Sequence, residues 1–455
     1  MIARNKNIIA ISLLITALCS FVWSIPFVST LSIGIFLFAF YLFIDQLGNT
    51  IPIKELAFLV ASLQLLMSSF IAFYIQDPDK AFLPKVLPNQ YFSYAVPGIL
   101  LFALGLFSYS SVLDYSTFKD KTQRYKLTSI AKQLIAIGYV AIAISPFVPG
   151  GLRYFFTLLV FLSYIGGIIF ILEKNHNKNQ VLWILIAFLP VVRDAFFSGV
   201  FYLAMIWIAF AFLYYMLIHF NWSYIQKATI IILAIFMITT LDGAKKDYRD
   251  IVWEQEGNNL SFATRTGLLG QLFWERLTFK NLTDESNLSA RVTRANQGAL
   301  VTWVMKWVPD NEPYAQGQTI KDAVIGAIFP RFLMPNKAKA GGVENFERFT
   351  GHNLINTSMN ISLLGEGWAN FGYWGGLIFM YTVGLFYSFA IKKFATLINN
   401  YPIYFFFIPY LFIYIIKAED DLLTPLNHII KASIVLFLLH RFYIRKITPV
   451  DVTTN

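Results

Sequence analysis

Long apolar runs alternate with short polar connections along most of the chain. A membrane-spanning helix needs about 20 apolar residues, and the sequence offers about twelve runs of this kind. They lie at roughly 7–23, 25–44, 56–76, 92–113, 130–148, 152–172, 180–197, 199–219, 226–242, 367–391, 402–416 and 428–442. The division at Ser198-Gly199 is ambiguous and the last two runs are short, so eleven or thirteen spans are alternatives. The pattern predicts an all-α polytopic membrane protein with about 12 transmembrane helices.

The apolar pattern is interrupted over residues 243–365. This segment divides the chain into three expected parts, which are the spans within 1–242, the long connection 243–365 and the spans within 366–455. The connection contains four tryptophans, at 253, 274, 303 and 307, and a disordered segment rarely carries so many aromatic residues.

Short helices lying over the bundle are the structure that we expect for this connection. Residues 268–282 and 299–308 have an amphipathic pattern, which is typical of segments that lie in the interface or re-enter the bundle. Thr319 as N-cap, with Asp322 at the third position, predicts a further helix. Pro330 is expected to end that helix.

Composition supports the membrane assignment and orients the chain. Residues are 57% hydrophobic and only 14% charged, against about 25% charged in soluble domains. Lys and Arg of the short connections gather on the side of the N-terminus, as in cytoplasmic loops. The opposite side holds Lys80, Lys85, Arg153, Arg193 and Lys417. Both termini are therefore expected in the cytoplasm and the long connection outside. The net charge of +10 follows from this bias, so we expect no nucleic-acid partner.

The N-terminal run resembles a signal peptide in length, but further apolar sequence follows at once. We therefore expect an uncleaved first span. The single cysteine, Cys19, lies inside this run, which excludes a disulfide within the chain.

Several kinds of chemistry have no matching motif in the sequence. It contains no Gly-rich phosphate loop and no Gly-x-Ser-x-Gly nucleophile elbow. His, Cys, Asp and Glu do not occur with metal-ligand spacing. We therefore expect a site on the outer face that uses neither cofactor nor metal, and a substrate that supplies the energy.

Arginines are the main candidates for binding in the long connection. Guanidinium groups bind phosphate through two parallel hydrogen bonds and keep their charge. The connection contains Arg249, Arg265, Arg276, Arg291, Arg294, Arg331 and Arg348. Arg291 and Arg294 lie one helical turn apart, beside Asn296 and Gln297. Arg331 lies between an apolar helix and Pro335, where burial would require an anionic partner. Solvated or ion-paired arginines are the alternative interpretation.

Three further ionisable groups are candidates because of their position. Arg193, beside Asp194, lies near the outer end of the seventh span, and ionisable residues at membrane depth are often functional. His352 is the one histidine of the long connection and could accept a proton from a hydroxyl. Glu366 lies where the chain returns to the membrane. A hydrogen-bonded structural role is the alternative for each.

A set of short motifs resembles a known family. The motifs are RANQG (294–298), PYAQGQT (313–319), FPR (329–331), MPNK (334–337), NTSMNIS (356–362) and GEGWANFGYWGG (365–376). Together they are similar to the Wzy-type polymerases of bacterial O-antigen and capsule repeat units. The likeness covers only about 290–376. Elsewhere the chain is similar only as a many-span protein with one long outer loop.

The resemblance implies a GT-C-like membrane glycosyltransferase of the bacterial inner membrane, metal-independent and without a nucleotide sugar. The growing glycan on undecaprenyl diphosphate would be transferred to a hydroxyl of the next lipid-linked repeat unit at the outer face. A repeat-unit flippase and a chain-length regulator would be partners. The catalytic candidates are then His352, Glu366, Arg291 and Arg331. Binding of diphosphate or glycan is assigned to Arg193, Arg249, Arg294, Gln297, Lys337, Arg348 and Asn360.

Two other functions remain open at this stage. A ligase that moves finished glycan to an acceptor would share the same plan and the same chemistry. A flippase or transporter would place Arg193 and Asp194 in its path, although the sequence has no paired broken helices.

Overall fold

The computed structural model describes residues 6–75, 82–110, 113, 118–119, 125–173, 178–219, 222–253, 260–277, 289, 292–329, 333–354 and 357–446. Within these ranges the protein is all-α, and its single β-contact is an isolated bridge between Leu47 and Thr50. The predicted fold class is thus confirmed at the level of an all-α, apolar, many-helix chain.

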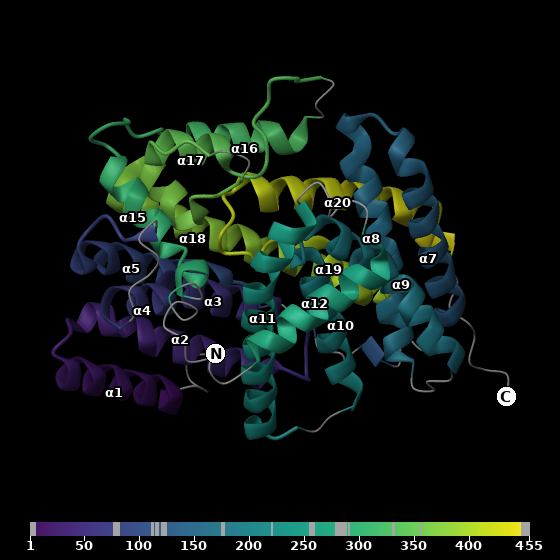
Figure 1. Cartoon of the computed structure of the whole chain (residues 1–455), viewed down its shortest axis with the longest axis horizontal. Coiled ribbons are helices and arrows are strands. Elements are labelled where there is room, and N and C mark those ends of the chain that lie inside the picture. The colour runs from purple at the N-terminus through teal and green to yellow at the C-terminus, as the bar shows by residue number, and fades with distance from the viewer. Residues whose placement is uncertain are drawn as a thin grey trace.

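Eleven helical elements lie within the described residues of the first half of the chain. They are α1 (Lys6–Trp23), α2 (Phe27–Gln46), α3 (Ile53–Ser62), the π-helical turn η1 (Leu63–Met67), α4 (Ser68–Tyr74), α5 (Pro88–Leu106), α7 (Leu127–Ile144), η3 (Ser145–Phe147), α8 (Gly150–Leu172), α9 (Lys178–Ser198) and α10 (Tyr202–His219). Figure 1 shows α1 to α5 on one side of the molecule and α7 to α10 on the other.

The second half begins with α11 (Tyr224–Trp253), which is followed by α12 (Phe262–Arg276), α15 (Gly298–Trp307), α16 (Gln318–Ile328) and α17 (Val343–Thr350). The chain ends with α18 (Ser362–Asn400), η5 (Pro402–Phe407), α19 (Ile408–Phe412), α20 (Leu423–Phe442) and η6 (Ile444–Lys446). In Figure 1, α18 to α20 run between the two groups of N-terminal helices.

Eight helical stretches in the described residues are long and apolar enough to cross a membrane. They are Phe27–Gln46, Ile53–Tyr74, Leu127–Phe147, Gly150–Leu172, Lys178–Ser198, Tyr224–Trp253, Ser362–Asn400 and Leu423–Lys446. Three shorter apolar helices, Asn7–Trp23, Tyr202–Ile218 and Pro402–Phe412, accompany them. The predicted break at Ser198-Gly199 is confirmed, because α9 ends at Ser198 and Gly199 takes a positive φ of 69°.

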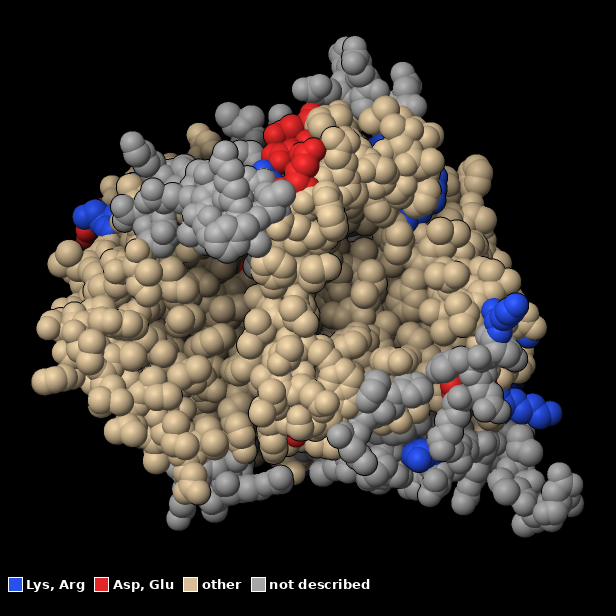
Figure 2. All heavy atoms as spheres, turned by 60° about the horizontal axis from the view of Figure 1, so that its bottom comes forward, with Lys and Arg blue, Asp and Glu red and all other residues tan. Residues whose placement is uncertain are grey.

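The surface agrees with an apolar environment. Figure 2 shows a broad face almost without charged side chains, with Lys, Arg, Asp and Glu near its edges. Large apolar side chains such as Leu185 and Ile232 are 64% and 59% exposed. Such exposure is unfavourable in water and favourable against lipid.

Close packing joins α5 to α18, which are distant in sequence. A Cβ added at Gly105 would lie 2.2 Å from the Tyr381 carbonyl oxygen, and one at Gly384 would lie 2.2 Å from the Phe102 carbonyl oxygen. Only glycine permits this backbone approach, the usual device for packing helices in membranes. The α18 helix is also kinked at Gly372, where φ is 65° and ψ is −153°.

The long connection differs from its expected bounds at both ends. The α11 helix continues past residue 242 to Trp253, and α18 begins at Ser362 rather than near residue 366. Between them lie short helices, as predicted. Of these, α12 packs on α9 and α11, α15 on α17 and α18, and α16 on α20. A second apolar core, with Trp303, Phe346 and Phe349 at its centre, joins this segment to α18.

The expected cap of α16 is wrong. Gly317, with a φ of 88°, precedes the helix as its N-cap, and Thr319 lies inside the first turn. The Thr319 hydroxyl is instead bonded to Glu366. The helix ends at Ile328, just before Pro330, as the sequence predicts.

Candidate functional site

The RANQG stretch anchors the long connection in the helix bundle. It meets the third predicted span at η1, where the π-helical turn leaves backbone carbonyls without their usual helical partners. The backbone N–H of Gln297 donates to the Gln64 carbonyl oxygen at 3.1 Å. The Tyr91 hydroxyl donates to the Leu65 carbonyl oxygen. Two backbone carbonyls exposed by the π-turn are therefore bonded by residues outside it.

Asn296 reinforces this contact from the other side. Its Oδ1 accepts a hydrogen bond from the Ser69 hydroxyl at 2.8 Å and one from the Ala299 N–H at 3.2 Å. The second bond satisfies one of the free N–H groups at the start of α15. Asn296 is 3% exposed. Asn296 and the Gln297 backbone therefore have clear structural roles.

Glu366 lies at the start of α18 and is bound on both carboxylate oxygens. Oε1 accepts from the Thr319 hydroxyl at 2.6 Å, and Oε2 accepts from the Leu422 N–H at 2.7 Å. Asn370, one turn further along α18, donates to the Thr319 hydroxyl oxygen at 2.7 Å. The Glu366 side chain is 1% exposed. It therefore ties α16, α18 and the connection between α19 and α20 together.

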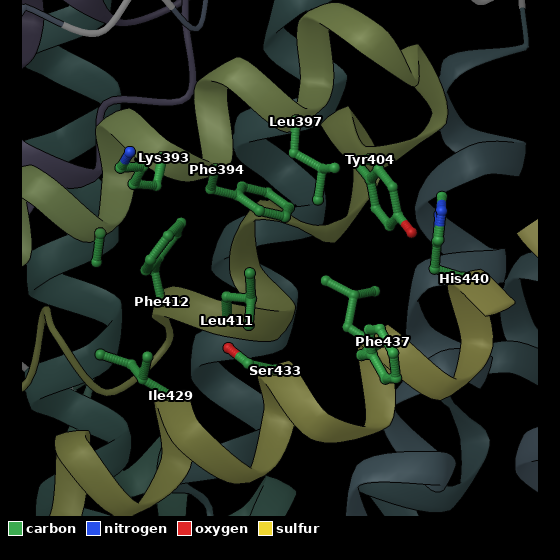
Figure 3. Close-up of a pocket in the computed structure, with 12 residues that line it drawn as sticks. Lys393, Phe394, Leu397, Tyr404, Leu411, Phe412, Ile429, Ser433, Phe437 and His440 are labelled. Atoms are coloured by element: carbon green, nitrogen blue, oxygen red, sulfur yellow. The ribbon is translucent and has the colours of Figure 1, made fainter.

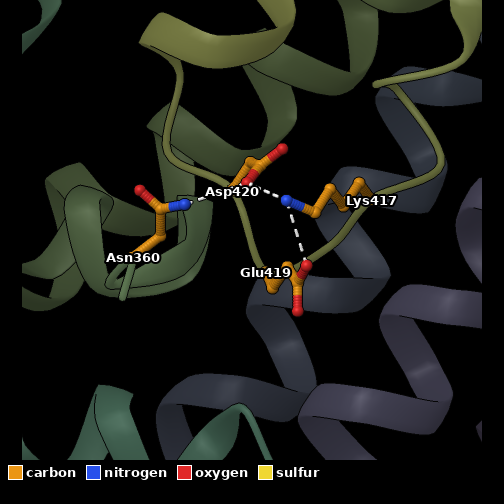
Figure 4. A network of polar contacts seen from close by, with 4 residues as sticks. All are labelled: Asn360, Lys417, Glu419 and Asp420. Carbon is orange, nitrogen blue, oxygen red and sulfur yellow. Dashed lines mark hydrogen bonds and ion pairs between the residues drawn. The ribbon is translucent and has the colours of Figure 1, made fainter. Parts of the chain in front are cut away.

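That connection carries a compact group of charges, shown in Figure 4. Lys417 Nζ lies 2.8 Å from Asp420 Oδ1 and 3.0 Å from Glu419 Oε1. Asn360, which precedes α18, donates to Asp420 Oδ1 at 2.9 Å. Asn345 of α17 donates to Asp421 Oδ2 at 2.9 Å. The long connection is thus bonded to both aspartates.

The aspartates of this group are almost completely buried, at 1% exposure each. Burial raises the pKa of Asp420 to about 7, although Lys417 partly opposes the change. Burial also raises the pKa of Asp421. For Lys417, burial would lower the pKa, but the carboxylates of Asp420 and Glu419 outweigh it and raise the pKa above its usual range. Asp420 Oδ2 and Asp421 Oδ1 accept no hydrogen bond from any described residue.

A polar pocket of about 190 Å³ lies beside the first turns of α20, the helix that follows this group in the chain. Its wall includes Lys337, Lys431 and Asn427, together with Gly150 and Gly151 at the start of α8. A helix N-terminus carries a partial positive charge, so two ammonium groups and a helix end make this pocket cationic. Leu423 also lines it, and the preceding residue, Leu422, binds Glu366. The cationic pocket therefore lies at the end of α20 that is joined to the connection carrying the carboxylates.

The Lys337 side chain is held in place by the end of α16. Its Nζ donates to the carbonyl oxygens of Gly326 and Phe329, each at 2.5 Å. Lys431 of α20 lies over the Tyr154 ring, with Nζ 5.3 Å from the ring centroid. Both lysines are thus positioned by the fold, and Lys431 is the one that the sequence did not suggest.

His352 lies just after the end of α17, the helix whose Asn345 binds Asp421. Its ring stacks on Trp303 with the centroids 4.6 Å apart. Nδ1 lies 2.8 Å from the Thr350 carbonyl oxygen. A carbonyl can only accept, so Nδ1 carries the proton in the neutral ring and Nε2 carries the lone pair. His352 is exposed and is therefore able to meet a substrate hydroxyl.

Three of the described arginines, Arg193, Arg249 and Arg265, contact residues 196–199 at the C-terminal end of α9. Arg193 lies over the Phe197 ring at 4.9 Å, and Arg249 donates to the Gly199 carbonyl oxygen at 2.7 Å. Arg348 pairs with Glu312 at 2.6 Å. Arg294 is exposed on the short helix before Asn296. Of these four, Arg193 and Arg249 thus contact the same end of α9, whereas Arg348 is paired with Glu312.

Two further arginines of the long connection make structural contacts. Arg265 is 2% exposed and donates to the Leu260 carbonyl oxygen at 3.0 Å. Arg276 pairs with Asp247 at 2.6 Å. Arg291 and Arg331, the two arginines given catalytic roles from the sequence, lie outside the described residues.

Sequence reasoning missed Lys417, Asp420, Asp421 and Lys431. The available signal was the run KAEDD at 417–421, four charged residues in one short connection between apolar runs. Such a concentration is unusual beside a membrane. Among the described residues, no group of three or more His, Cys, Asp or Glu side chains is arranged to hold a metal ion.

Comparisons with known proteins identify no relative. No family model, no curated protein and no solved structure matches the chain. The similarity to repeat-unit polymerases, seen in the short motifs, therefore stays a prediction.

Proposed function

We propose that this chain is an integral-membrane glycosyltransferase that polymerises oligosaccharide repeat units carried on undecaprenyl diphosphate. In this proposal it has a GT-C-like plan of about twelve spans and lies in a bacterial cytoplasmic membrane. Both termini are cytoplasmic and the long connection is on the outer face. The observation that carries the proposal is the cationic pocket at the end of α20 that is joined to the connection carrying the buried carboxylates.

The pocket suits the diphosphate of a lipid-linked donor. During transfer the bond between the sugar C1 and the phosphate oxygen breaks, and undecaprenyl diphosphate leaves with the bonding electrons. Negative charge therefore grows on the diphosphate, and cations held nearby stabilise it. Lys337, Lys431 and the N-terminus of α8 would supply that charge. Arg291 and Arg331 are the remaining candidates for the same role.

The acceptor hydroxyl must lose its proton as its oxygen bonds to C1. His352 suits this step because its tautomer leaves the Nε2 lone pair available and its ring is exposed. Glu366 is less suited, since both of its oxygens already accept hydrogen bonds within the protein. We therefore assign proton acceptance to His352 and a positioning role to Glu366.

Deletion of the gene, followed by gel analysis of the surface polysaccharide, tests the reaction class. A polymerase predicts single repeat units on the normal anchor and loss of the long ladder. Loss of all attached glycan, with long chains accumulating on the lipid carrier, would indicate a ligase. Lipid-linked units trapped inside the cell would indicate a flippase.

Complementation with Lys431→Gln tests the pocket. We expect ladder formation to fall at least about tenfold, because a preorganised charge at a developing anion is lost. Lys321→Gln is the matched control, since Lys321 is exposed on α16 and does not line the pocket. Equal ladders from both variants at equal protein levels would refute the role of the pocket.

A further inference from the structure

A second pocket lies toward the other ends of α18 and α20. It has a volume of about 370 Å³, within the range of about 300–1,000 Å³ that is typical of small-molecule sites. Side chains of α18, η5, α19 and α20 line it, and most of them are Phe, Leu or Ile. Glu366 and Leu423 lie at the starts of α18 and α20, whereas this pocket is formed near their C-terminal ends. It is therefore distinct from the proposed transfer site.

Figure 3 shows polar side chains at both ends of this pocket, with Lys393 at one end and Tyr404 and His440 at the other, and Ser433 in the wall between them. Tyr404 and His440 lie together at one end, with their rings stacked at a centroid distance of 6.0 Å. The middle of the pocket is apolar and is lined by Phe394, Leu411 and Phe412. Lys393 is exposed and lies over the Phe389 ring, so the buried polar groups are those of Tyr404 and His440. An occupant that fits them has a polar group at that end and an apolar chain along the pocket.

The polar end has unused hydrogen-bonding capacity. Tyr404 is 0% exposed, yet its hydroxyl has no hydrogen-bond partner among the described residues. The same holds for His440 Nδ1. Buried polar atoms almost always have a partner, and each one left without a partner costs about 1–3 kcal/mol. Two such atoms at one end of an apolar pocket indicate a ligand with a polar group there.

Charge favours an anionic polar group. Arg441, Arg445 and Lys446 follow His440 directly in the chain and are all exposed. The charge bias of the short connections places this end of α20 at the cytoplasmic surface. Basic residues beside a pocket between helices on that side attract anionic lipid headgroups.

We propose that this pocket binds an anionic phospholipid of the cytoplasmic leaflet. One acyl chain lies along the apolar wall formed by α18, α19 and α20. The phosphate accepts hydrogen bonds from the Tyr404 hydroxyl and the His440 ring, and the basic end of α20 selects for negative charge.

Native mass spectrometry of the purified full chain tests the binding. The protein is titrated with phosphatidylglycerol or with phosphatidylcholine of identical acyl chains. We expect one phosphatidylglycerol to bind at least about tenfold more tightly than phosphatidylcholine. Tyr404→Phe should weaken this lipid by about tenfold, the effect of one hydrogen bond to a charged group. Tyr401→Phe is the control, because Tyr401 does not line the pocket.

A second pair of variants fills the pocket. Ser433 lines it, whereas Ile434 is the next residue of α20 and does not. Ser433→Phe should abolish the tight lipid, and Ile434→Phe should leave it unchanged. In lipid-free detergent, Tyr404→Phe should unfold at the same temperature as the wild type or higher, because it removes a polar atom without a partner.

Three results would overturn the proposal. One is equal affinity for the two lipids in the wild type. Another is equal weakening by Tyr401→Phe and Tyr404→Phe. The third is that Ser433→Phe does not lose the tightly bound lipid. If this variant instead changes its oligomeric state, a second copy of the chain occupies the pocket.

Discussion

Gly298 is the position at which the anchoring of the long connection can be tested most directly. It begins α15 and faces the π-helical turn η1 across a close contact. A Cβ added at Gly298 would lie 2.0 Å from Ser69 Oγ and 2.2 Å from the Tyr91 hydroxyl oxygen. Both hydroxyls belong to the hydrogen-bond group that joins Asn296 and Leu65. Gly298→Ala must therefore displace both of them.

The expected loss of stability follows from three contributions. Overpacking a well-packed interior costs about 1–3 kcal/mol. Pushing the Tyr91 hydroxyl away from the Leu65 carbonyl leaves a buried donor without its acceptor, at a further cost of about 1–3 kcal/mol. Alanine recovers up to about 1 kcal/mol over glycine in a helix. We therefore expect Gly298→Ala to lower the free energy of unfolding by about 3 kcal/mol.

Equilibrium unfolding of the purified protein in detergent micelles measures this change. Gly270→Ala in α12 is the matched control, because a Cβ at Gly270 meets no atom within 4 Å. The control should be neutral or slightly stabilising. Ser69→Ala combined with Gly298→Ala should lose less than the two single changes added together. Equal stability of Gly298→Ala and Gly270→Ala would refute the proposed contact.

Three further predictions concern the charged groups. Lys417→Met should lower the free energy of unfolding by about 3 kcal/mol, because it leaves Asp420 buried without its cation. Chemical unfolding at pH 8 measures this loss, and an unchanged unfolding midpoint would contradict the prediction. The pKa of Asp420 is about 7 in the folded protein and about 3.9 in the unfolded chain. The folded protein therefore holds this proton more tightly, so the contribution of Asp420 to stability is greatest below pH 4 and falls as the pH rises to about 7. Asp420→Asn should flatten that dependence in thermal unfolding from pH 4 to pH 8, and an unaltered slope would exclude Asp420 as its source. His352→Phe, which keeps the stack on Trp303, should abolish repeat-unit polymerisation while changing the unfolding free energy by less than about 0.5 kcal/mol; a retained ladder would exclude proton acceptance by His352.

The helices could be predicted from the sequence because their cause is local. A run of about 20 apolar residues must bond its own backbone inside lipid, and the helix is the structure that does so. This argument located the break at Ser198-Gly199 correctly. It could not predict where α11 ends, because residues 243–253 are helical although their sequence is polar. Nor could it locate η1, since a π-turn inside an apolar run depends on the partners of its free carbonyls.

The cap of α16 shows why local signals can mislead. Thr319 and Asp322 have the spacing of a helix start, and a helix does begin there. Yet the Thr319 hydroxyl binds Glu366, which lies 47 residues further along the chain. Glycine at 317 can adopt the left-handed conformation and begin the helix without a side-chain cap. The tertiary contact therefore determined the use of Thr319.

Glu366 and Asp420 illustrate the limit for the site itself. The sequence singles out Glu366, because an ionisable residue at the membrane edge is often functional. In the fold both of its oxygens accept hydrogen bonds, so its carboxyl group already holds three segments together. Asp420, beside Lys417, has a pKa near neutrality and one carboxylate oxygen that accepts no hydrogen bond from any described residue. A group of this kind can exchange a proton near pH 7 when a substrate or a movement of the long connection reaches it. Tests of glycan transfer should therefore compare Asp420→Asn with Glu366→Gln. If only Asp420→Asn loses activity while keeping its stability, proton transfer is assigned to Asp420 in the connection between α19 and α20.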